Sequence, residues 1–193
     1  MNELLKQNIK RHINLSEDEL KMFNTYFKTK VIHKKNYLLK AGEVCKYEAF
    51  VIKGCFRVFS IDKNGNENVL YFAISDWWLS DIDSFTNQIP SQLFIQALED
   101  SEILLINKSN KVKAYQEIPK IERLFRIMTQ KFLVSNQRRI LQNHSLTSEE
   151  RYQYFLANYP QIAQKITNIQ LASYLGITHE FVSKIRRKIA QKK

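Results

Sequence analysis

The sequence is poor in the residues that build metal centres and disulfide frameworks. It contains only two cysteines, Cys45 and Cys55, and four histidines. Two cysteines are too few for a disulfide framework, a four-cysteine zinc site or a four-thiolate iron–sulfur cluster. We therefore expect both cysteines to be small buried hydrophobic residues. We also expect no metal site and no iron–sulfur cofactor.

Long apolar runs are missing as well. No stretch of about eighteen apolar residues occurs, so the sequence predicts no transmembrane helix. Residues 1–8 lack the basic-then-apolar order of a signal peptide. These features predict a cytoplasmic protein that does not contact a membrane.

The usual signatures of enzymes are absent from the sequence. It has no nucleophile elbow, phosphate-binding glycine loop or His-x-His pair. A metal-dependent oxygenase or isomerase on a β-roll would need about two or three histidines and a carboxylate around one metal. Of the four histidines, only His33 lies in the expected strand region. We predict that the protein has no catalytic residues, and keep a small-molecule-binding or enzymatic β-roll as a distant alternative.

Positive charge is concentrated in the second half of the chain. The formal net charge is +11, with a pI near 9.6. Residues 1–115 contain 16 Lys and Arg against 14 Asp and Glu, whereas residues 116–193 contain 14 against 5. A basic excess confined to one part of a chain is typical of nucleic-acid binding. The charge therefore predicts a polyanionic partner that meets the C-terminal part.

Residues 166–188 have the pattern of a helix-turn-helix. Leu171, Ala172 and Leu175 place three apolar groups on one side of a short helix. Gly176 suits the left-handed position that ends a helix, because it has no Cβ to clash there. Two short helices joined by a three- to four-residue turn with a glycine define this motif. We expect Thr178 to cap the second helix, whose buried stripe we predict to be Phe181, Val182 and Ile185.

The exposed side of the second predicted helix carries polar and basic residues suited to DNA. In such motifs the N-terminal residues of this helix face base edges in the major groove. We assign His179, Glu180 and Lys184 to bases, since Glu can accept from cytosine N4 and Lys can donate to guanine. The alternative is an ordinary helical hairpin with a solvated basic end. The full set of predicted DNA-contacting residues is Thr167, Asn168, Thr178, His179, Glu180, Ser183, Lys184, Arg187 and Lys188.

The first half of the chain reads as two short helices followed by strands. We expect helices over residues 2–13 and 16–27, the second with a capping box of Ser16 and Glu19. Short β-branched and aromatic runs follow between residues 37 and 107, and Asn64-Gly65 is a strong hairpin signal. Many short strands separated by regular turns predict a sandwich or jelly roll.

A long helix is predicted from Lys120 to about Asn143, after Pro119. Its apolar residues fall on more than one side, so two separate surfaces must cover it. We expect the β domain to cover one side and a symmetry-related copy of the chain to cover the other. The alternative is a helix buried entirely within one large domain. The predicted limits are 1–117 for the β-roll, 118–145 for the dimerisation helix and 146–193 for the DNA-binding domain.

This order of parts resembles the Crp/Fnr family of bacterial transcription regulators over nearly the whole chain. The resemblance rests on Gly42-Glu43, Phe50-Val-Ile-Lys-Gly54, Asn64-Gly65-x-Glu67, the long helix and the helix-turn-helix. It implies an α+β fold: an N-terminal double-stranded β-helix (jelly roll) with flanking helices, a long dimerisation helix and an all-α helix-turn-helix domain. It also implies a homodimer that binds double-stranded DNA under the control of an effector, with RNA polymerase as a further partner.

This sequence differs from the family members that bind cAMP at the positions where those members hold the phosphate of cAMP. Those members use a Gly-Glu pair and, after a short loop, an Arg-Ser pair, which here become Ser80-Asp81 and Ser91-Gln92. A buried phosphodiester needs a cation, and Asp81 would repel it. The sequence thus predicts that cAMP is not the ligand, and leaves the cofactor unknown. The resemblance gives the effector-pocket candidates as Ser80, Asp81, Ser91, Gln92, Asn136 and Gln137.

Two more expectations concern the end of the chain and the β-roll. Members usually continue into a small β wing, whereas this sequence stops at Lys193, so we expect a basic tail at Gln191–Lys193 in its place. Without cAMP-binding residues, the β-roll could also be a scaffold that senses nothing. Trp77-Trp78 could form a ligand platform, although core packing or a domain interface is the interpretation we favour.

Overall fold

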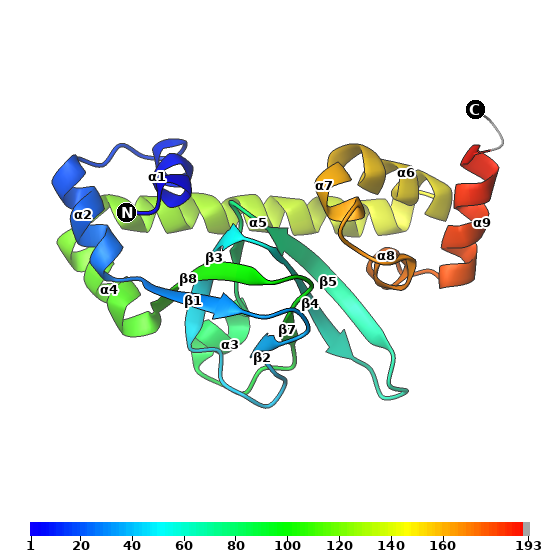
Figure 1. Cartoon of the computed structure of the whole chain (residues 1–193), viewed down its shortest axis with the longest axis horizontal. Helices are drawn as coiled ribbons and strands as arrows, with labels where there is room; N and C mark the ends of the chain where they lie inside the picture. The colour runs from blue at the N-terminus through cyan, green and yellow to red at the C-terminus, as the bar shows by residue number, and fades with distance from the viewer. Residues whose placement is uncertain (191–193) are drawn as a thin grey trace.

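The computed structural model describes residues 1–190 and shows an elongated molecule built along one helix. Figure 1 shows that helix, α5 (Lys120–Ser145), running the length of the molecule. The β-roll lies against its middle, α1, α2 and α4 gather at one end, and α6 to α9 at the other. The α+β class and the jelly roll predicted from the sequence are confirmed.

The β-roll consists of two four-stranded antiparallel sheets. The first has the strand order β1-β8-β3-β6 and the second β2-β7-β4-β5. The strands are β1 (Lys28–Ile32), β2 (Tyr37–Leu39), β3 (Tyr47–Lys53), β4 (Cys55–Ile61), β5 (Glu67–Ile74), β6 (Trp78–Leu79), β7 (Phe94–Ala97) and β8 (Ser101–Asn107). The predicted hairpin at Asn64-Gly65 joins β4 and β5, with Gly65 at a φ of +82°. The sequence did not predict β1 or β6.

The helices are close to the predicted ones, with three additions. The remaining helices are α1 (Glu3–Lys10), α2 (Glu17–Thr25), α3 (Ile82–Asn87), α4 (Lys108–Glu117), α6 (Ser148–Asn158), α7 (Pro160–Ala163), α8 (Asn168–Leu175) and α9 (His179–Ala190). The capping box of Ser16 and Glu19 is present at α2, and Thr147 with Glu150 forms another at α6. The sequence did not predict α3, α4 or α7. The predicted domain limits at 117 and 145 fall at the ends of α4 and α5.

Three hydrophobic clusters hold these parts together. One packs α1, α2, α4 and the start of α5 on the outer face of the first sheet. The second fills the roll between the two sheets. The third joins the outer face of the second sheet to α6, α7, α8 and α9, through residues such as Phe72 and Phe155. The β-roll and the C-terminal helices therefore share a core.

The long helix has two different faces, as the sequence predicted. Ile121, Leu124 and Phe125 are buried against the rest of the chain. By contrast, Leu133 and Ile140 are 65% and 59% exposed, and Val134 and Leu141 are exposed as well. In the described part of the chain no helix is long and apolar enough to span a bilayer.

Both cysteines are buried, as expected for small hydrophobic residues. Cys45 lies inside the roll and Cys55 in the third cluster. Burial raises the pKa of the Cys55 thiol to about 12. This thiol therefore stays protonated at neutral pH, which does not suit a reactive or metal-binding cysteine.

Candidate functional site

The two C-terminal helices α8 and α9 form the helix-turn-helix that the sequence predicted. Thr167 caps α8 in a capping box with Gln170. Gly176 ends α8 in the left-handed conformation, with a φ of +66°. The Thr178 hydroxyl accepts a hydrogen bond from Phe181 N–H at 3.3 Å and so caps α9. Gly176 thus ends the first helix of the motif and Thr178 begins the second, as their local conformational preferences predict.

The orientation of α9 is fixed by apolar contacts with α8. Val182 and Ile185 of α9 are buried with Leu171, Ala172 and Leu175 of α8. Ala172 is 2% exposed, so its small side chain is buried in this cluster. Between His179 and Lys188, the polar side chains of α9 lie on its other faces, where all but the half-buried Ser183 are exposed.

The prediction that Phe181 belongs to the buried stripe of α9 is wrong. Its side chain is 41% exposed, whereas its neighbour Val182 is completely buried. Successive residues of a helix point about 100° apart, so α8 can cover Val182 and Ile185 without covering Phe181. A large aromatic side chain therefore lies exposed in the first turn of α9, beside Glu180 and Lys184.

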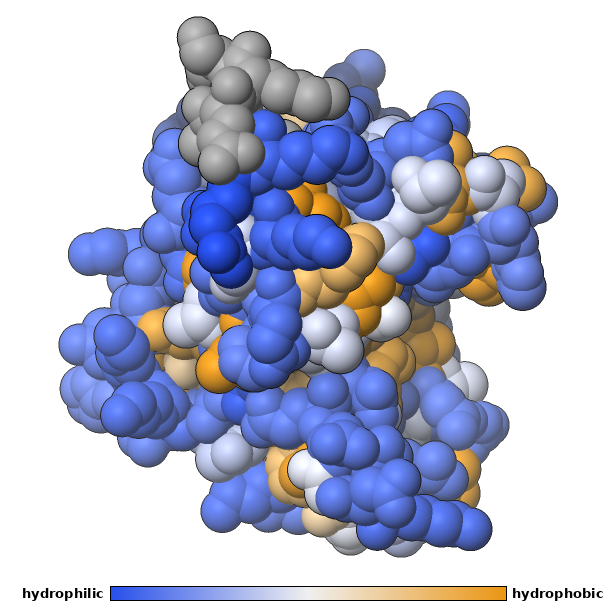
Figure 2. All heavy atoms as spheres, turned by 90° about the vertical axis from the view of Figure 1, so that its right-hand side faces the viewer, coloured by the Kyte–Doolittle hydropathy of each residue, from blue (hydrophilic) through white to orange (hydrophobic). Residues whose placement is uncertain are grey.

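The predicted reading residues lie on the exposed side of α9. His179, Glu180 and Lys184 are all exposed, and His179 Nδ1 lies 3.0 Å from Glu180 Oε1. The pKa of Glu180 is held below its usual range by its own backbone N–H and by the Thr178 hydroxyl. Glu180 is therefore an ionised hydrogen-bond acceptor at neutral pH. Figure 2 views the molecule from this end, where most of the surface is hydrophilic.

The other predicted contact residues have different surroundings. Thr167 is exposed at the start of α8, and the half-buried Asn168 accepts a hydrogen bond from Arg186 Nη1 at 2.6 Å. The Ser183 hydroxyl donates to the His179 carbonyl at 3.0 Å. Arg187 is exposed, whereas Lys188 forms an ion pair with Glu149 of α6 at 2.6 Å. The predicted basic tail at residues 191–193, and the expected absence of a wing, lie outside the described residues.

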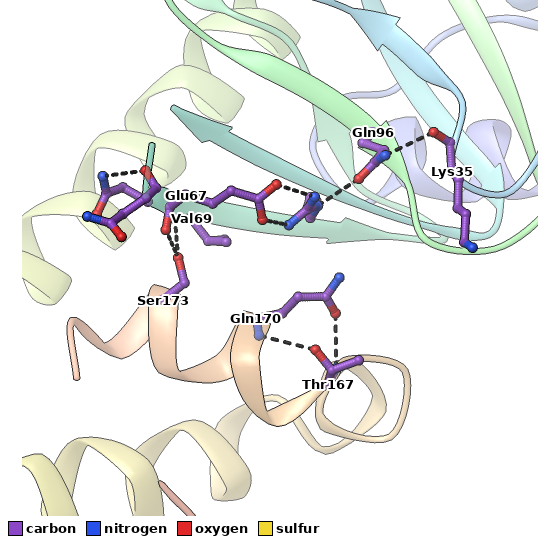
Figure 3. Close-up of polar contacts among 10 residues, drawn as sticks. Lys35, Glu67, Val69, Gln96, Thr167, Gln170 and Ser173 are labelled. Atoms are coloured by element: carbon purple, nitrogen blue, oxygen red, sulfur yellow. Dashed lines mark hydrogen bonds and ion pairs between the residues drawn. The ribbon is translucent and has the colours of Figure 1, made fainter. Parts of the chain in front are cut away.

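Helix α8 is attached to the β-roll by hydrogen bonds that the sequence did not reveal. Ser173 Oγ accepts from Val69 N–H at 2.9 Å and donates to the Glu67 carbonyl at 2.5 Å (Figure 3). The Glu67 carboxylate pairs with Arg57, whose Nε donates to Gln96 at 2.9 Å. A polar chain therefore runs from the second sheet to the helix-turn-helix.

Arg139 of α5 strengthens the same junction. It donates to the carbonyls of Leu70, Val69 at 3.1 Å and Tyr174 at 2.9 Å. Its guanidinium also lies over the Tyr174 ring, 4.2 Å from the centroid. Burial lowers the pKa of Arg139 below its ordinary value. One cation thus links the long helix, the edge strand β5 and the end of α8.

The predicted effector residues are only partly brought together. Ser80, Asp81 and Asn136 line a groove of about 450 Å³ between the roll and α5. Ser91 is buried and donates to Asp81 Oδ2 at 2.6 Å, while Asp81 Oδ1 accepts from Ser84 N–H at the start of α3. Gln92 and Gln137 are exposed and do not line the groove. The carboxylate of Asp81 is thus already satisfied by the chain's own donors.

Comparisons with known proteins agree with this architecture. Residues 29–117 match the family model described as "Cyclic nucleotide-binding domain". The "Anaerobic regulatory protein" of Pasteurella multocida (strain Pm70) is 26% identical over 185 residues, which cover 89% of this chain and 66% of that protein. The chain thus spans just under two thirds of that relative's length.

Solved structures share the whole arrangement. FixK2 from Bradyrhizobium japonicum superposes with a TM-score of 0.76 at 19% identity, covering 86% of this chain and 85% of FixK2. A transcriptional regulator of the Crp/Fnr family from Eubacterium rectale gives 0.71 at 17% identity, covering 92% and 85%. The chain therefore shares the fold of these regulators. The residues that match the family model contain β2 to β8 and most of β1, and α5 to α9 follow them.

The groove beside Asp81 carries more acidic than basic side chains. The groove is lined by the acids Asp81 and Asp83, and its one lining cation is Arg139 among the residues that the structure describes. Arg139 is already engaged by backbone carbonyls. A phosphate placed beside Asp81 would meet a carboxylate and no free cation, which is unfavourable in a partly buried site.

Proposed function

We propose that this chain acts as a homodimeric, DNA-binding transcription regulator of the Crp/Fnr type that reads a palindromic site with α9. The observation that carries the proposal is the construction of α9. Val182 and Ile185 fix the helix on α8, while Glu180, Lys184 and Arg187 stay exposed along it. The basic excess of residues 116–193 supports the same reading, because phosphate contacts dominate affinity for DNA.

The exposed stripe of α5 supports a dimer. Leu133 and Ile140 are seven residues apart, as are Val134 and Leu141, and all four are exposed. A seven-residue apolar repeat on a helix is the pattern by which two helices pack along each other. We infer that a second copy covers this stripe, which places two α9 helices for two half-sites about 34 Å apart.

The role of the β-roll has two candidates. The groove between Asp81 and Asn136 supports a sensor for an unidentified small molecule. The bond between Ser91 and Asp81 supports the alternative, in which the roll is a scaffold and DNA binding needs no effector. In either case we propose RNA polymerase as a further partner, as the resemblance implies.

Selection of bound sequences from random duplex DNA tests the central proposal. We expect a palindrome with half-site centres about 10 base pairs apart. Sedimentation should show a dimer at the same protein concentration. A monomer at all concentrations, or recovery of sequences without symmetry, would contradict the proposal.

Calorimetry with cAMP should show no saturable binding at millimolar ligand, and a micromolar dissociation constant would refute our interpretation of Asp81.

A further inference from the structure

A second groove lies outside the one that contains Asp81. It has a volume of about 560 Å³ and is bordered by α1, by the turn that joins β5 to β6 and by α5. Trp77, Trp78 and Phe132 supply its aromatic surface, and His12 and Lys131 border it. Its size is within the usual range for small-molecule sites, roughly 300–1,000 Å³.

The two grooves are neighbours with a common wall. Tyr71 and Phe132 line both of them, and their rings meet edge to face with centroids 5.3 Å apart. Asp81 and Asn136 line the first groove and not the second. Ser80, one of the residues that correspond to the phosphate cradle, lines both grooves, so a ligand of the second groove would share Ser80 with the first but would not rely on Asp81 or Asn136.

Helix α1 forms its wall through buried hydrogen bonds. Asn8 is 5% exposed and donates to the Asp76 carbonyl at 3.0 Å and to its carboxylate at 2.9 Å. Arg11 pairs with the same carboxylate. Trp78 Nε1 donates to Asn8 Oδ1 at 3.4 Å. Contacts within the chain therefore hold this wall of the groove in place.

The groove retains one unpaired positive charge. Its two acids are neutralised, since Asp76 pairs with Arg11 and Glu48 pairs with Lys111 at 2.5 Å. Lys131 forms no ion pair within residues 1–190, and its Nζ lies 3.5 Å from His12 Nδ1. Burial and the charge of Lys131 lower the pKa of His12, so His12 is neutral at pH 7. An anionic group placed here would meet Lys131 as a free cation and His12 as a hydrogen-bond partner.

The surface beside these groups suits flat rings. Trp77 is 38% exposed, and Trp78 lies in a cluster with Phe50 and Phe125 at centroid distances of 5.3 and 5.2 Å. Aromatic faces and edges held in this way favour stacked or edge-to-face contact with another ring. One cation without a cradle of backbone N–H groups suits a single negative charge better than a phosphate.

We propose that this second groove binds a small aromatic carboxylate. The rings lie against Trp77, Trp78 and Phe132, and the carboxylate accepts hydrogen bonds from Lys131 and from His12. The site lies between α1 and α5, on the helix that we propose carries the dimer contact. It is independent of DNA binding, and its test uses no DNA.

The tryptophans provide a direct readout. The chain has two, and both line this groove. We expect naphthalene-2-carboxylate to quench their fluorescence saturably, with a matching dissociation constant from calorimetry. Naphthalene-2-carboxamide, the uncharged analogue, should bind more weakly.

Lys131→Met should weaken carboxylate binding about tenfold, because the variant loses one charge-assisted hydrogen bond. It should leave binding of the amide unchanged.

Three controls make the result decisive. Lys113→Met removes an exposed lysine of α4 far from the groove in sequence and should change nothing. Asn136→Ala alters the first groove and should leave the affinity unchanged. The double variant Leu133→Glu and Ile140→Glu, designed to be monomeric, should bind as the wild type does.

The proposal is overturned if the carboxylate does not bind saturably or Lys131→Met acts like Lys113→Met. It is equally overturned if Asn136→Ala abolishes binding, or if only the monomeric variant binds, which would mean that a second copy fills the groove.

Discussion

Ser173 and Val69 join the helix-turn-helix to the edge of the β-roll. The Ser173 hydroxyl accepts from Val69 N–H at 2.9 Å and donates to the carbonyl of Glu67, two residues earlier on the strand. β5 is an edge strand of its sheet, so its outward N–H and C=O groups have no neighbouring strand. Helix α8 satisfies them instead. The position of α9 in space therefore depends on the β4–β5 hairpin as well as on α8.

Arg139→Met should weaken this junction strongly. The change leaves the carbonyls of Val69, Leu70 and Tyr174 without their donor in a largely buried place. We expect the free energy of unfolding to fall by about 2–4 kcal/mol, as for other losses of buried hydrogen bonds to a charged group. Urea denaturation followed by circular dichroism measures it. Arg138→Met, at the exposed neighbouring position, should change stability by less than about 0.5 kcal/mol. Equal losses from the two variants would contradict the role of Arg139.

Glu180→Ala and Arg187→Ala should separate base reading from phosphate binding. Glu180 is an ionised acceptor at the start of α9, so its loss should relax preference at one base pair by about 1–3 kcal/mol. Arg187 is exposed further along the helix, and its loss should weaken all sequences alike and reduce the salt dependence. Binding titrations with the selected site and with single-base variants measure both. The same uniform loss from both variants would rule out the assignment.

Phe181 should contact a thymine methyl group, because an exposed aromatic residue in the first turn of a reading helix can pack against it. Replacing thymine by deoxyuridine removes only that methyl. At one position of the site, we expect this to cost the wild type about 1 kcal/mol, near the value of one buried methyl group. Phe181→Ala should be insensitive to the replacement. If no thymine in the site shows this difference, Phe181 does not read a methyl group.

Leu133→Glu with Ile140→Glu should produce a monomer. Two carboxylates on the exposed stripe of α5 would have to be buried unpaired in a helix-to-helix interface. Sedimentation equilibrium should then report one chain, and affinity for the palindrome should fall to that of a half-site. Val112→Glu places the same charge on an exposed apolar position of α4, and this variant should remain dimeric. A double variant that stays dimeric would exclude the stripe as the interface.

Lys131→Gln should raise the pKa of His12. Burial is the largest cause of its lowered pKa and the charge of Lys131 the second. Among the smaller effects, a hydrogen bond to the Arg11 backbone and the charge of Asp76 raise the pKa, and the charge of Arg11 lowers it. The variant should thus move the pKa part of the way back toward 6.5, as measured by NMR titration of the His12 ring. A lowered folded-state pKa makes the unfolded chain bind the proton first, so stability is lost as pH falls below about 6.5. Lys113→Gln should leave the titration unchanged.

Local signals made the helix-turn-helix predictable from the sequence. Gly176 and Thr178 set the two ends of the turn through their own backbone preferences and hydrogen bonds. The two apolar faces of α5 could also be predicted, because the spacing of apolar residues within one continuous helix determines which faces they occupy. The absence of a phosphate cradle at Ser80-Asp81 was also readable, because it needs only residue types.

Contacts between distant parts of the chain were not predictable. Phe181 and Val182 are adjacent and both apolar, and only the placement of α8 decides which one is buried. Ser173 and Val69 are 104 residues apart, and nothing near either one in the sequence marks the bond. The groove beside Trp77 and Trp78 exists because α1 docks through Asn8, a pairing over 68 residues.

The shared third core limits how this protein can be taken apart. The cluster around Phe155 and Leu171 is built from α6 to α9 on one side and from the outer face of β4 and β5 on the other. A fragment cut after residue 145 would expose that apolar face to water. The group of helices α6 to α9 is therefore not an interchangeable module. A chimaera that gives it to another roll would have to carry the matching sides of β4 and β5 with it.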